Sequence, residues 1–575
     1  MHRSQRQAAA TAYRAIWNIS TTGLDSDGNV SSNDDYDDDE NDAVLSDIDS
    51  NSDHHENGPI QSIFTSHDTS TMPSTSSVPP TEYVSRNGER WNAVPDIRFR
   101  NAQTRQWNIL RESQGPTRQA IQSGCGESPA DAFKIFLSTS VIDEIVLHTN
   151  SEARRRLSGA DWNETNRGEM YCFIGLLLLS GVYQAKNEPI AELWSKDDGR
   201  AFFAQSMSRD RFKSILRFIR FDDRNTRTER STNDKLAPLR SVLNSFIIKC
   251  RSSYKAGIDV TIDEQLMTFR GRCPFKMYLP DKPGRYGVKI WILADSKTNY
   301  CCNLEVYTGK RGSSREVGQS SRVVLELTDY ISNSGRNVTG DNFFTSLPLV
   351  RTLLGRNLTC NGTIRKNKAD IPPELVPNPQ RQVESSIFAF QRNCTMVSYV
   401  PKRNKAVILL SSGHDDSSCD SSSPFKPNMI LDYNSTKGGV DTLDQMVRQY
   451  SCKRKTRRWP LALFMNILDI ASYNAYVLFL SIHPSYKNNA PNRRRQFIIE
   501  MGKQLIAEYT CRLRPTNEPM MHESTQQLLS PRRRCRYCPY ARHRKSTMSC
   551  SVCRNPICKE HGNLICLQCI DGRNN

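Results

Sequence analysis

The feature that most constrains this fold is an alternating apolar strand that leads to an acidic residue. Ile258, Val260 and Ile262 recur at every second position, which is the period of a half-buried β-strand. Asp263 follows directly at the predicted end of this strand, so it should point to the face opposite the buried side chains. Taken alone, such a residue is most simply a carboxylate that caps a turn.

Further acidic residues stand at similar points of the chain. Asp341 ends the short strand predicted within 337–344, and a Gly-Gly turn opens a helix that carries Asp441 and Asp444 on one face. One to three carboxylates suffice to bind Mg²⁺, and two such ions about 3.5–4 Å apart can clamp the oxygens of a phosphodiester. We therefore expect Asp263, Asp341 and Asp441 to form a cluster that binds two Mg²⁺ ions.

Three multi-residue blocks surround these acids: IDEQLMTFRGRCPFKMYLPDKPGRYGVKIW, GDNFFTSLPL and TKGGVDTLDQMVRQYSCKRKTRRWP. They resemble the piggyBac transposase family, and the resemblance runs from about residue 130 to the C-terminus. It implies a mixed α/β fold with a ribonuclease-H-like catalytic core, in which the Asp-Asp-Asp triad falls on Asp263, Asp341 and Asp441. Asp444 matches a further family acid close to the metals.

The resemblance also implies a reaction and its partners. The protein would be a DNA transposase that acts as a homodimer on double-stranded DNA at the terminal inverted repeats of its transposon. Metal-activated water would nick each end, the freed 3′-hydroxyl would form a hairpin, and the opened ends would join target DNA at TTAA. One alternative is a domesticated DNA-binding protein without catalysis, although the four acids are kept. A weaker alternative is a ubiquitin ligase that acts through a C-terminal zinc module.

Charge divides the chain into an acidic N-terminal region and a basic body. The formal net charge is +17, and residues 1–85 contribute −12 through 15 acidic and 3 basic residues, which leaves +29 for the remainder. A basic body favours a polyanionic partner, most simply nucleic acid. We interpret one run as a clamp on DNA phosphates, with an import signal or a solvated helix end as alternatives: Lys453, Arg454, Lys455, Arg457 and Arg458.

Apolar runs and cysteines indicate where the protein works. No run of about 18 apolar residues occurs, so we expect no membrane span. The N-terminus lacks the apolar stretch of a secretory signal, which predicts an intracellular chain with reduced thiols, and we expect it in the nucleus. Of the 18 cysteines, 7 lie within 535–569, and such clustering favours zinc over disulfides in a reducing compartment.

Four ligand pairs near the C-terminus have the spacing of zinc sites: Cys535 and Cys538, Cys550 and Cys553, Cys558 and His561, and Cys566 and Cys569. They match two tetrahedral zinc ions, which should hold together a module too small to bury much core. A cross-brace would join the first pair to the third and the second to the fourth. Spacing leaves a sequential arrangement open, and the resemblance favours the cross-brace. Arg532, Arg533 and Arg534 precede the first pair and are predicted to bind DNA.

Hydrophobic periodicity and composition divide the chain into seven segments, and the resemblance implies the roles of the ribonuclease-H-like core and of the helical dimerisation and DNA-binding domain. Apolar residues at three- and four-residue spacing predict helices from residue 130 onward, and 286–294 and 300–307 predict a hairpin. The segments are a disordered acidic region (1–115), a helical dimerisation and DNA-binding domain (116–256), a ribonuclease-H-like core (257–371), a strand-rich insertion (372–430), the second part of the core (431–456), the second part of the helical domain (457–530) and a cysteine-rich zinc finger (531–575).

Overall fold

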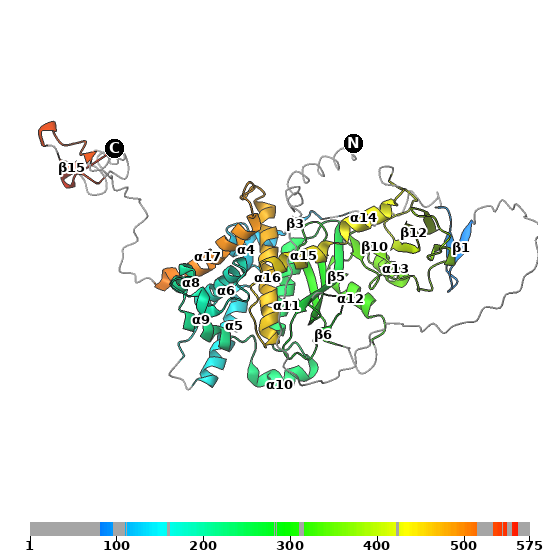
Figure 1. Cartoon of the computed structure of the whole chain (residues 1–575), viewed down its shortest axis with the longest axis horizontal. Coiled ribbons are helices and arrows are strands. Elements are labelled where there is room, and N and C mark those ends of the chain that lie inside the picture. The colour runs from blue at the N-terminus through cyan, green and yellow to red at the C-terminus, as the bar shows by residue number, and fades with distance from the viewer. Residues whose placement is uncertain are drawn as a thin grey trace, which may run out of the picture. The chain divides into compact units, whose positions relative to one another are not determined.

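The structure is a computed structural model of the 575-residue chain (Figure 1). It describes residues 81–95, 110, 112–157, 162–280, 282, 284–309, 316–420, 425–513, 533–542, 544–548 and 555–561. The predictions made for residues 1–80 lie outside this range. The chain divides into two compact units: unit 1 comprises Met1–Phe136, Phe246–Gln449 and Ile470–Arg493, and unit 2 comprises Leu137–Ser245, Tyr450–Asp469 and Arg494–Asn575.

Unit 1 is built on one large mixed sheet. Its central strand, β5 (Asp259–Thr268), pairs antiparallel with β7 (Tyr286–Asp295), which pairs antiparallel with β8 (Cys301–Val306). On the other side, β5 runs parallel to β9 (Asn337–Gly340), and β9 runs parallel to β10 (Thr359–Thr363). The order in this part of the sheet is therefore β8-β7-β5-β9-β10, and β7 and β8 form the hairpin expected from the sequence.

Strand β5 is longer and more buried than the sequence predicts. Val260, Thr261 and Ile262 are all buried, whereas Ile258 precedes the strand and is exposed. The strand continues well past Asp263, so this residue lies in its middle rather than at its end, which corrects the prediction. Because β5 pairs on both edges and is covered by other elements, its burial does not follow a simple alternation.

Strands from the predicted insertion extend the same sheet instead of forming a separate one. β13 (Lys405–Ser411) pairs antiparallel with β10, so the sheet continues without a break beyond the core strands. β12 (Cys394–Lys402) pairs with β13, and β11 (Ser386–Gln391) pairs with β12, both antiparallel. The insertion is thus joined to the core through backbone hydrogen bonds.

Two short strands from the N-terminal part of the chain complete this edge of the sheet. β1 (Glu82–Val84) pairs with β2 (Arg90–Asn92), and β2 pairs with β11. Trp91 is fully buried at this point, which gives the segment an apolar anchor. These residues lie inside the region 1–115 that the sequence predicts to be disordered, so the prediction is wrong for 82–92.

Four helices of unit 1 lie between or after the core strands in the chain. α12 (Gln319–Thr328) lies between β8 and β9, and α13 (Leu347–Gly355) makes the crossover from β9 to the parallel strand β10. α14 (Asn428–Thr436) and α15 (Gly439–Gln449) come after β13, and α15 contacts β5 and β7. The shorter elements of unit 1 are β3 (Gly115–Pro116), α3 (Arg118–Gln122), α4 (Pro129–Lys134), β4 (Tyr254–Lys255), β6 (Met277–Tyr278), η1 (Asp329–Ile331) and η2 (Pro373–Leu375).

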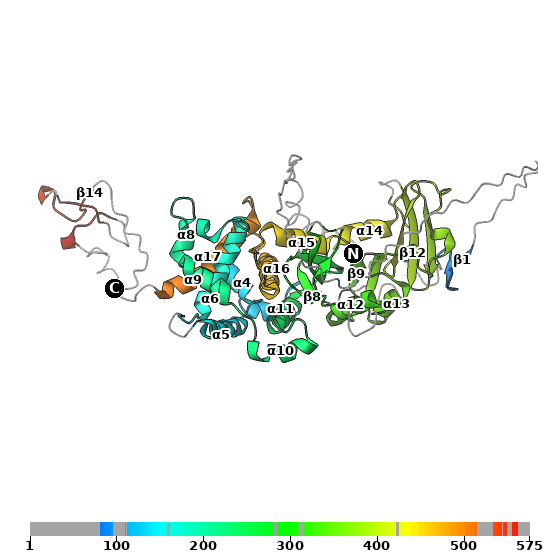
Figure 2. The ribbon, with the colours of Figure 1, turned by 60° about the horizontal axis from the view of Figure 1, so that its bottom comes forward.

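Unit 2 is helical, as the periodicity predicts. Its helix α6 is buried from Gly168 to Val182, and a helix that is apolar all round belongs in a core. α5 contacts both α6 and α9, and Figure 2 shows these three together. The helices are α5 (Thr139–Arg156), α6 (Arg167–Val182), α7 (Ile190–Leu193), α8 (Ala201–Ser206), α9 (Arg209–Phe218), α10 (Arg224–Asn233) and α17 (Arg493–Leu513), and α11 (Arg240–Ser253) and α16 (Trp459–Ile482) run from one unit into the other.

One helix in the described part of the chain is long and apolar enough to cross a membrane by length and composition. It is α16, and 94% of its most apolar window is buried inside the protein, as in the core helix of a folded domain. The described C-terminal part holds a small hairpin of β14 (Arg533–Arg534) and β15 (Lys545–Ser546) and two single turns, η3 (Tyr540–Arg542) and η4 (Lys559–His561).

Candidate functional site

Three elements of unit 1 bring the predicted acids together. In the parallel pair of β5 and β9, Ile262 is level with Gly340, so the next residues, Asp263 and Asp341, lie side by side. Asp441 lies in the first turn of α15, which contacts β5. Beside burial and the charge of Glu264, the charges of Asp441 and Asp341 raise the pKa of Asp263, so both other carboxylates lie close enough to act on Asp263.

The close approach of α15 to β5 depends on Gly439. A Cβ atom at this position would lie 2.8 Å from Oγ1 of Thr261, closer than real side-chain carbons come to their neighbours. The Thr261 hydroxyl also donates to the carbonyl oxygen of Thr436, the last residue of α14, at 2.6 Å. The Gly-Gly turn predicted from the sequence thus allows α15 to lie on the face of β5 that carries both Thr261 and Asp263.

Asp444, the fourth predicted acid, already has protein partners. Its Oδ1 accepts a hydrogen bond of 2.8 Å from Nε2 of Gln265, and its other carboxylate oxygen is paired with Arg448. Gln265 lies two residues after Asp263 and therefore on the same face of β5. Asp444 thus ties α15 to β5 beside the other acids, while a guanidinium offsets its charge.

Burial and crowding oppose full ionisation of the cluster. Burial, the charge of Glu264 and the charges of the other two acids raise the pKa of Asp263 to about 7. Burial also raises the pKa of Asp341, and the charge of Glu264 adds to this effect. A site of this kind holds protons at neutral pH unless a cation compensates the negative charge.

The sequence does not predict two neighbours of the acid cluster, Glu264 and Tyr433. Glu264 is paired with Lys282 at 3.3 Å and with Lys289 at 4.0 Å. Burial raises the pKa of the Tyr433 phenol on α14, and the charges of the three clustered acids raise it further. The strand period shows only that Glu264 follows Asp263 onto the opposite face, and Tyr433 carries no sequence signal of its own.

The donor set of this cluster fits a hard divalent cation. Asp263, Asp341 and Asp441 offer only carboxylate oxygens, which Mg²⁺ prefers, and the ion completes its shell with water. A bound cation would also relieve the repulsion that raises the pKa of Asp263. Asp444 fits a direct ligand less well, because Gln265 and Arg448 occupy its oxygens.

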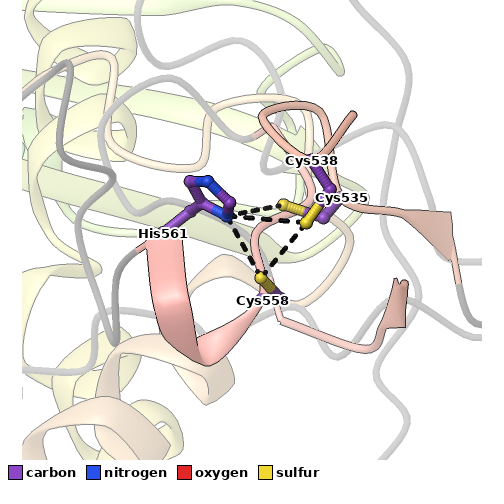
Figure 3. Close-up of side chains that lie close together, drawn as sticks. All are labelled: Cys535, Cys538, Cys558 and His561. Atoms are coloured by element: carbon purple, nitrogen blue, oxygen red, sulfur yellow. Dashed lines mark hydrogen bonds between the residues drawn. The ribbon is translucent and has the colours of Figure 1, made fainter. Parts of the chain in front are cut away.

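A different metal-ligand cluster lies in the C-terminal module (Figure 3). The Sγ atoms of Cys535, Cys538 and Cys558 and Nδ1 of His561 all lie within 4.8 Å of one another, and the shortest of the hydrogen bonds among them joins Cys558 to His561 at 3.2 Å. Among the described residues it is the one group of ligand atoms gathered so tightly. It unites the first and third predicted pairs and suits one tetrahedral zinc.

The remaining predictions for this module have different outcomes. The second and fourth ligand pairs and one arginine lie outside the described residues: Cys550, Cys553, Cys566, Cys569 and Arg532. Arg533 is described by its backbone in β14, and the guanidinium of Arg534 stacks over the ring of Tyr540 at 3.9 Å. DNA contacts by these arginines stay a prediction.

The basic run after α15 is not a uniform row of exposed charges. Arg454 is buried, and its guanidinium donates to the carbonyl oxygens of Ala185, at 3.0 Å, and Glu188. The guanidinium of Arg458 donates to three further carbonyl oxygens, those of Leu216, Arg217 and Ile219. Their hydrogen bonds lie within unit 2, which counts against phosphate contacts by Arg454 and Arg458, and DNA binding by this run stays a prediction.

The other basic residues of this run are placed differently. Lys453 is half-buried, and burial lowers its pKa to about 8. Lys455 and Arg457 are exposed, and neither has a hydrogen bond or ion pair to any residue that the structure describes. Asp469 of α16 anchors the start of the run, since it accepts hydrogen bonds from Ser451 Oγ at 2.6 Å and from the backbone N–H of Cys452 at 2.8 Å.

Comparison with known proteins gives one consistent result. The family model described as Transposase IS4 matches residues 128–476, which include all four acids. The human PiggyBac transposable element-derived protein 3 is 24% identical over 399 residues, which cover 66% of this chain and 65% of the relative. The human PiggyBac transposable element-derived protein 2 is 23% identical over 373 residues, 61% of each chain. The chain therefore spans less than two thirds of the length of these curated relatives.

A solved structure gives the same result for the fold. A piggyBac transposase in a synaptic complex with hairpin DNA matches with a TM-score of 0.65 and 36% sequence identity. The match covers 80% of this chain and 100% of that one. The large mixed sheet and its helices therefore have the piggyBac transposase fold.

Proposed function

Because the chain belongs to the piggyBac family of transposases, we propose that it cuts and joins DNA at the ends of a transposon. The observation that carries this proposal is the meeting of three carboxylates from β5, the end of β9 and α15, with the pKa of Asp263 raised to about 7 by burial and neighbouring charge. Titratable groups perturbed in this way are typical of reaction centres.

We assign the central part of the sheet to the ribonuclease-H-like core. The strand order β8-β7-β5-β9-β10 supports this assignment. In it, β7 is antiparallel to β5 and β8 is antiparallel to β7, whereas β9 is parallel to β5 and β10 is parallel to β9. In this arrangement Asp263 belongs to the first core strand and Asp341 follows the fourth. The helical part, 116–256 and 457–530, is then the dimerisation and DNA-binding domain. The insertion at 372–430 lies between the two parts of the core.

In this proposal Asp263, Asp341 and Asp441 hold two Mg²⁺ ions. Such ions supply an activated water and stabilise the attacking and leaving oxygens of a phosphodiester. The protein's own part is to present three oxygen donors from rigid elements, which the contact of α15 with β5 at Gly439 and Thr261 secures. Asp444 orients α15 through Gln265 rather than serving as a fourth main ligand.

We propose two zinc ions in the C-terminal module, arranged as a cross-brace. The cluster of Cys535, Cys538, Cys558 and His561 supports the first site, since a cross-brace joins these two pairs. The second site would take the remaining two pairs. The metal would hold a module that has little apolar core of its own.

The proposed partner is double-stranded DNA. The solved relative is described in a synaptic complex with hairpin DNA, which supports transposon ends as substrate and a hairpin intermediate. A homodimer as the working unit is a further part of this proposal. Integration at TTAA and a nuclear location are parts of the same proposal. Of the basic run, Lys455 and Arg457 are the residues we assign to DNA phosphates, because both are exposed.

A nicking assay tests the proposed function. Labelled duplexes that carry the inverted repeats flanking the coding sequence are incubated with the full chain and Mg²⁺, and DNA binding is followed separately with Ca²⁺. Asp263→Asn, Asp341→Asn and Asp441→Asn should each abolish nicking and leave binding intact. If the unaltered chain binds these ends but never nicks them, the protein is a domesticated DNA-binding protein, and the proposed activity is wrong.

A further inference from the structure

Unit 2 contains a cluster of arginines around a buried acid, and this cluster shares no residue with the acid cluster or the zinc cluster. Glu152, on the last turns of α5, has a side chain that is 2% exposed. Four guanidinium groups surround it, at 2.9, 3.3, 2.8 and 3.4 Å: those of Arg155, Arg156, Arg220 and Arg224. Although burial alone would raise the pKa of Glu152, hydrogen bonds and charge from these arginines lower it to about 2.

A second buried acid holds the neighbouring arginines. Asp222, between α9 and α10, has a side chain that is 5% exposed and is paired with Arg227 and, at 2.7 Å, with Arg230. The two acids therefore pair with six guanidinium groups, four more than their own two charges balance. Arg458 of the basic run lies beside them, since the charges of Arg220, Glu152 and Arg227 all act on its pKa.

The number of arginines exceeds what the buried acids need. Arg220 is the inner partner of Glu152, with a side chain 16% exposed, whereas those of Arg155, Arg156 and Arg224 are 43%, 53% and 48% exposed. A guanidinium has five N–H donors in a fixed fork. The outer arginines therefore keep N–H donors that face solvent. Their pairing with the buried Glu152 carboxylate also limits the conformational freedom of each arginine side chain, which reduces the entropy lost when a ligand binds.

We propose that Arg155, Arg156 and Arg224 form a second phosphate-binding surface that binds the backbone of duplex DNA. The excess of positive charge favours a polyanion, and the planar forks match phosphate oxygens. Phosphate contacts orient a duplex without reading its sequence. The inference rests on the proposed function for its partner, DNA, and adds a surface formed by residues of unit 2, whereas the acid cluster belongs to unit 1.

The test compares two triple variants of the full chain that lose equal charge. Binding to a fluorescein-labelled duplex of arbitrary sequence is measured by anisotropy at several salt concentrations without Mg²⁺. Each lost phosphate contact lowers the slope of log affinity against log salt by about 0.9, so R155Q/R156Q/R224Q should lower it by up to about 2.7. The control removes three exposed arginines that each pair with one acid: R90Q/R167Q/R209Q. We expect this control to change the slope by less than about 0.9.

Two further variants guard against misfolding. R155K/R156K/R224K keeps the charge and should retain most of the slope, and R156Q alone, at the most exposed of the three positions, should lower it by about 0.9. Equal slopes for the cluster variant, its control and the unaltered chain would overturn the proposal, as would failure of the unaltered chain to bind duplex DNA. The lower slope must be seen with this duplex of arbitrary sequence, because phosphate contacts are independent of sequence.

The result separates from that of the nicking assay. Asp263→Asn should bind the duplex with the slope of the unaltered chain, since the acid cluster is not part of this surface. If the chain never nicks DNA but the arginine variant lowers the slope, the transposase activity fails and the binding surface stands. If nicking depends on the acids but the slopes are equal, only the binding surface fails.

Discussion

Replacing Asp263 with Asn should stabilise the metal-free protein at alkaline pH. Burial, Glu264 and the two other clustered acids oppose the ionised form of Asp263 and raise its pKa to about 7. Asn is neutral and nearly equal in volume, so it removes the repulsion without leaving a cavity. The same change removes a metal ligand, so Mg²⁺ should stabilise the unaltered chain and not the variant.

The size of this effect follows from the pKa of Asp263. Its ordinary value is 3.8 and its value in the fold is about 7, and about 3 units at 1.36 kcal/mol each correspond to about 4 kcal/mol. Because the folded state binds this proton more tightly, the contribution to stability is fully present below pH 3.8 and is lost as pH rises through 7. Between pH 5 and pH 8 the free energy of unfolding should therefore shift in favour of the variant by roughly 2–3 kcal/mol.

Urea unfolding of the full chain, followed by tryptophan fluorescence in buffers freed of Mg²⁺, measures this difference. The midpoints of Asp263→Asn and the unaltered chain should separate progressively between pH 5 and pH 8. Glu229→Gln, which changes an exposed acid on α10, is the control and should show no such trend. The reasoning would be refuted if the free energies of unfolding of Asp263→Asn and the unaltered chain differed by the same amount at all pH values. Equal stabilisation of both proteins by Mg²⁺ would also refute it.

Three further predictions test other parts of the structure. Arg454→Met should lower the free energy of unfolding by about 3 kcal/mol, because it removes two hydrogen bonds of a charged group, worth about 1.5–3 kcal/mol each, while the relief of the buried charge offsets part of this loss. In thermal unfolding, the control Lys455→Met should stay within about 0.5 kcal/mol of the unaltered chain. Equal losses for the two variants would contradict this prediction. Cys558→Ser should remove at least one zinc per chain by elemental analysis, and unchanged zinc content would exclude the assigned ligand set. Gly439→Ala should cost about 1–3 kcal/mol through its clash with Thr261 and reduce nicking, while a variant as stable and active as the parent would show that α15 need not lie so close to β5.

The sequence predicts the elements that carry Asp341 and Asp441, because their signals are local. Asp341 follows a short strand and Asp441 opens a helix after glycines, and both features survive folding. The position of Asp263 in its strand could not be predicted, because the length of β5 is set by pairing with β7 and β9, which lie elsewhere in the chain. The sequence places Asp444 beside the acids of the metal site, and only the fold shows that Gln265 and Arg448 bind its two carboxylate oxygens.

The basic run shows what local patterns cannot settle. Five cations within six residues are typical of a nucleic-acid clamp, yet Arg454 binds a carbonyl 269 residues away and Arg458 one that is 239 residues away. The arginines around Glu152 are likewise scattered over 155–224, so no window of sequence displays them as one group. By contrast, the zinc cluster of paired ligands follows from two-residue spacing, which is a local geometric requirement.

The most direct test of the central claim is a Mn²⁺ titration of the full chain followed by electron paramagnetic resonance. The claim is that Asp263, Asp341 and Asp441 hold divalent metal together. The unaltered chain should bind Mn²⁺ at neutral pH, Mg²⁺ should compete, and the Asn variant at each of the three positions should weaken binding markedly, whereas Glu229→Gln should not. Binding of Mn²⁺ by any of the three variants with unaltered affinity would contradict the claim.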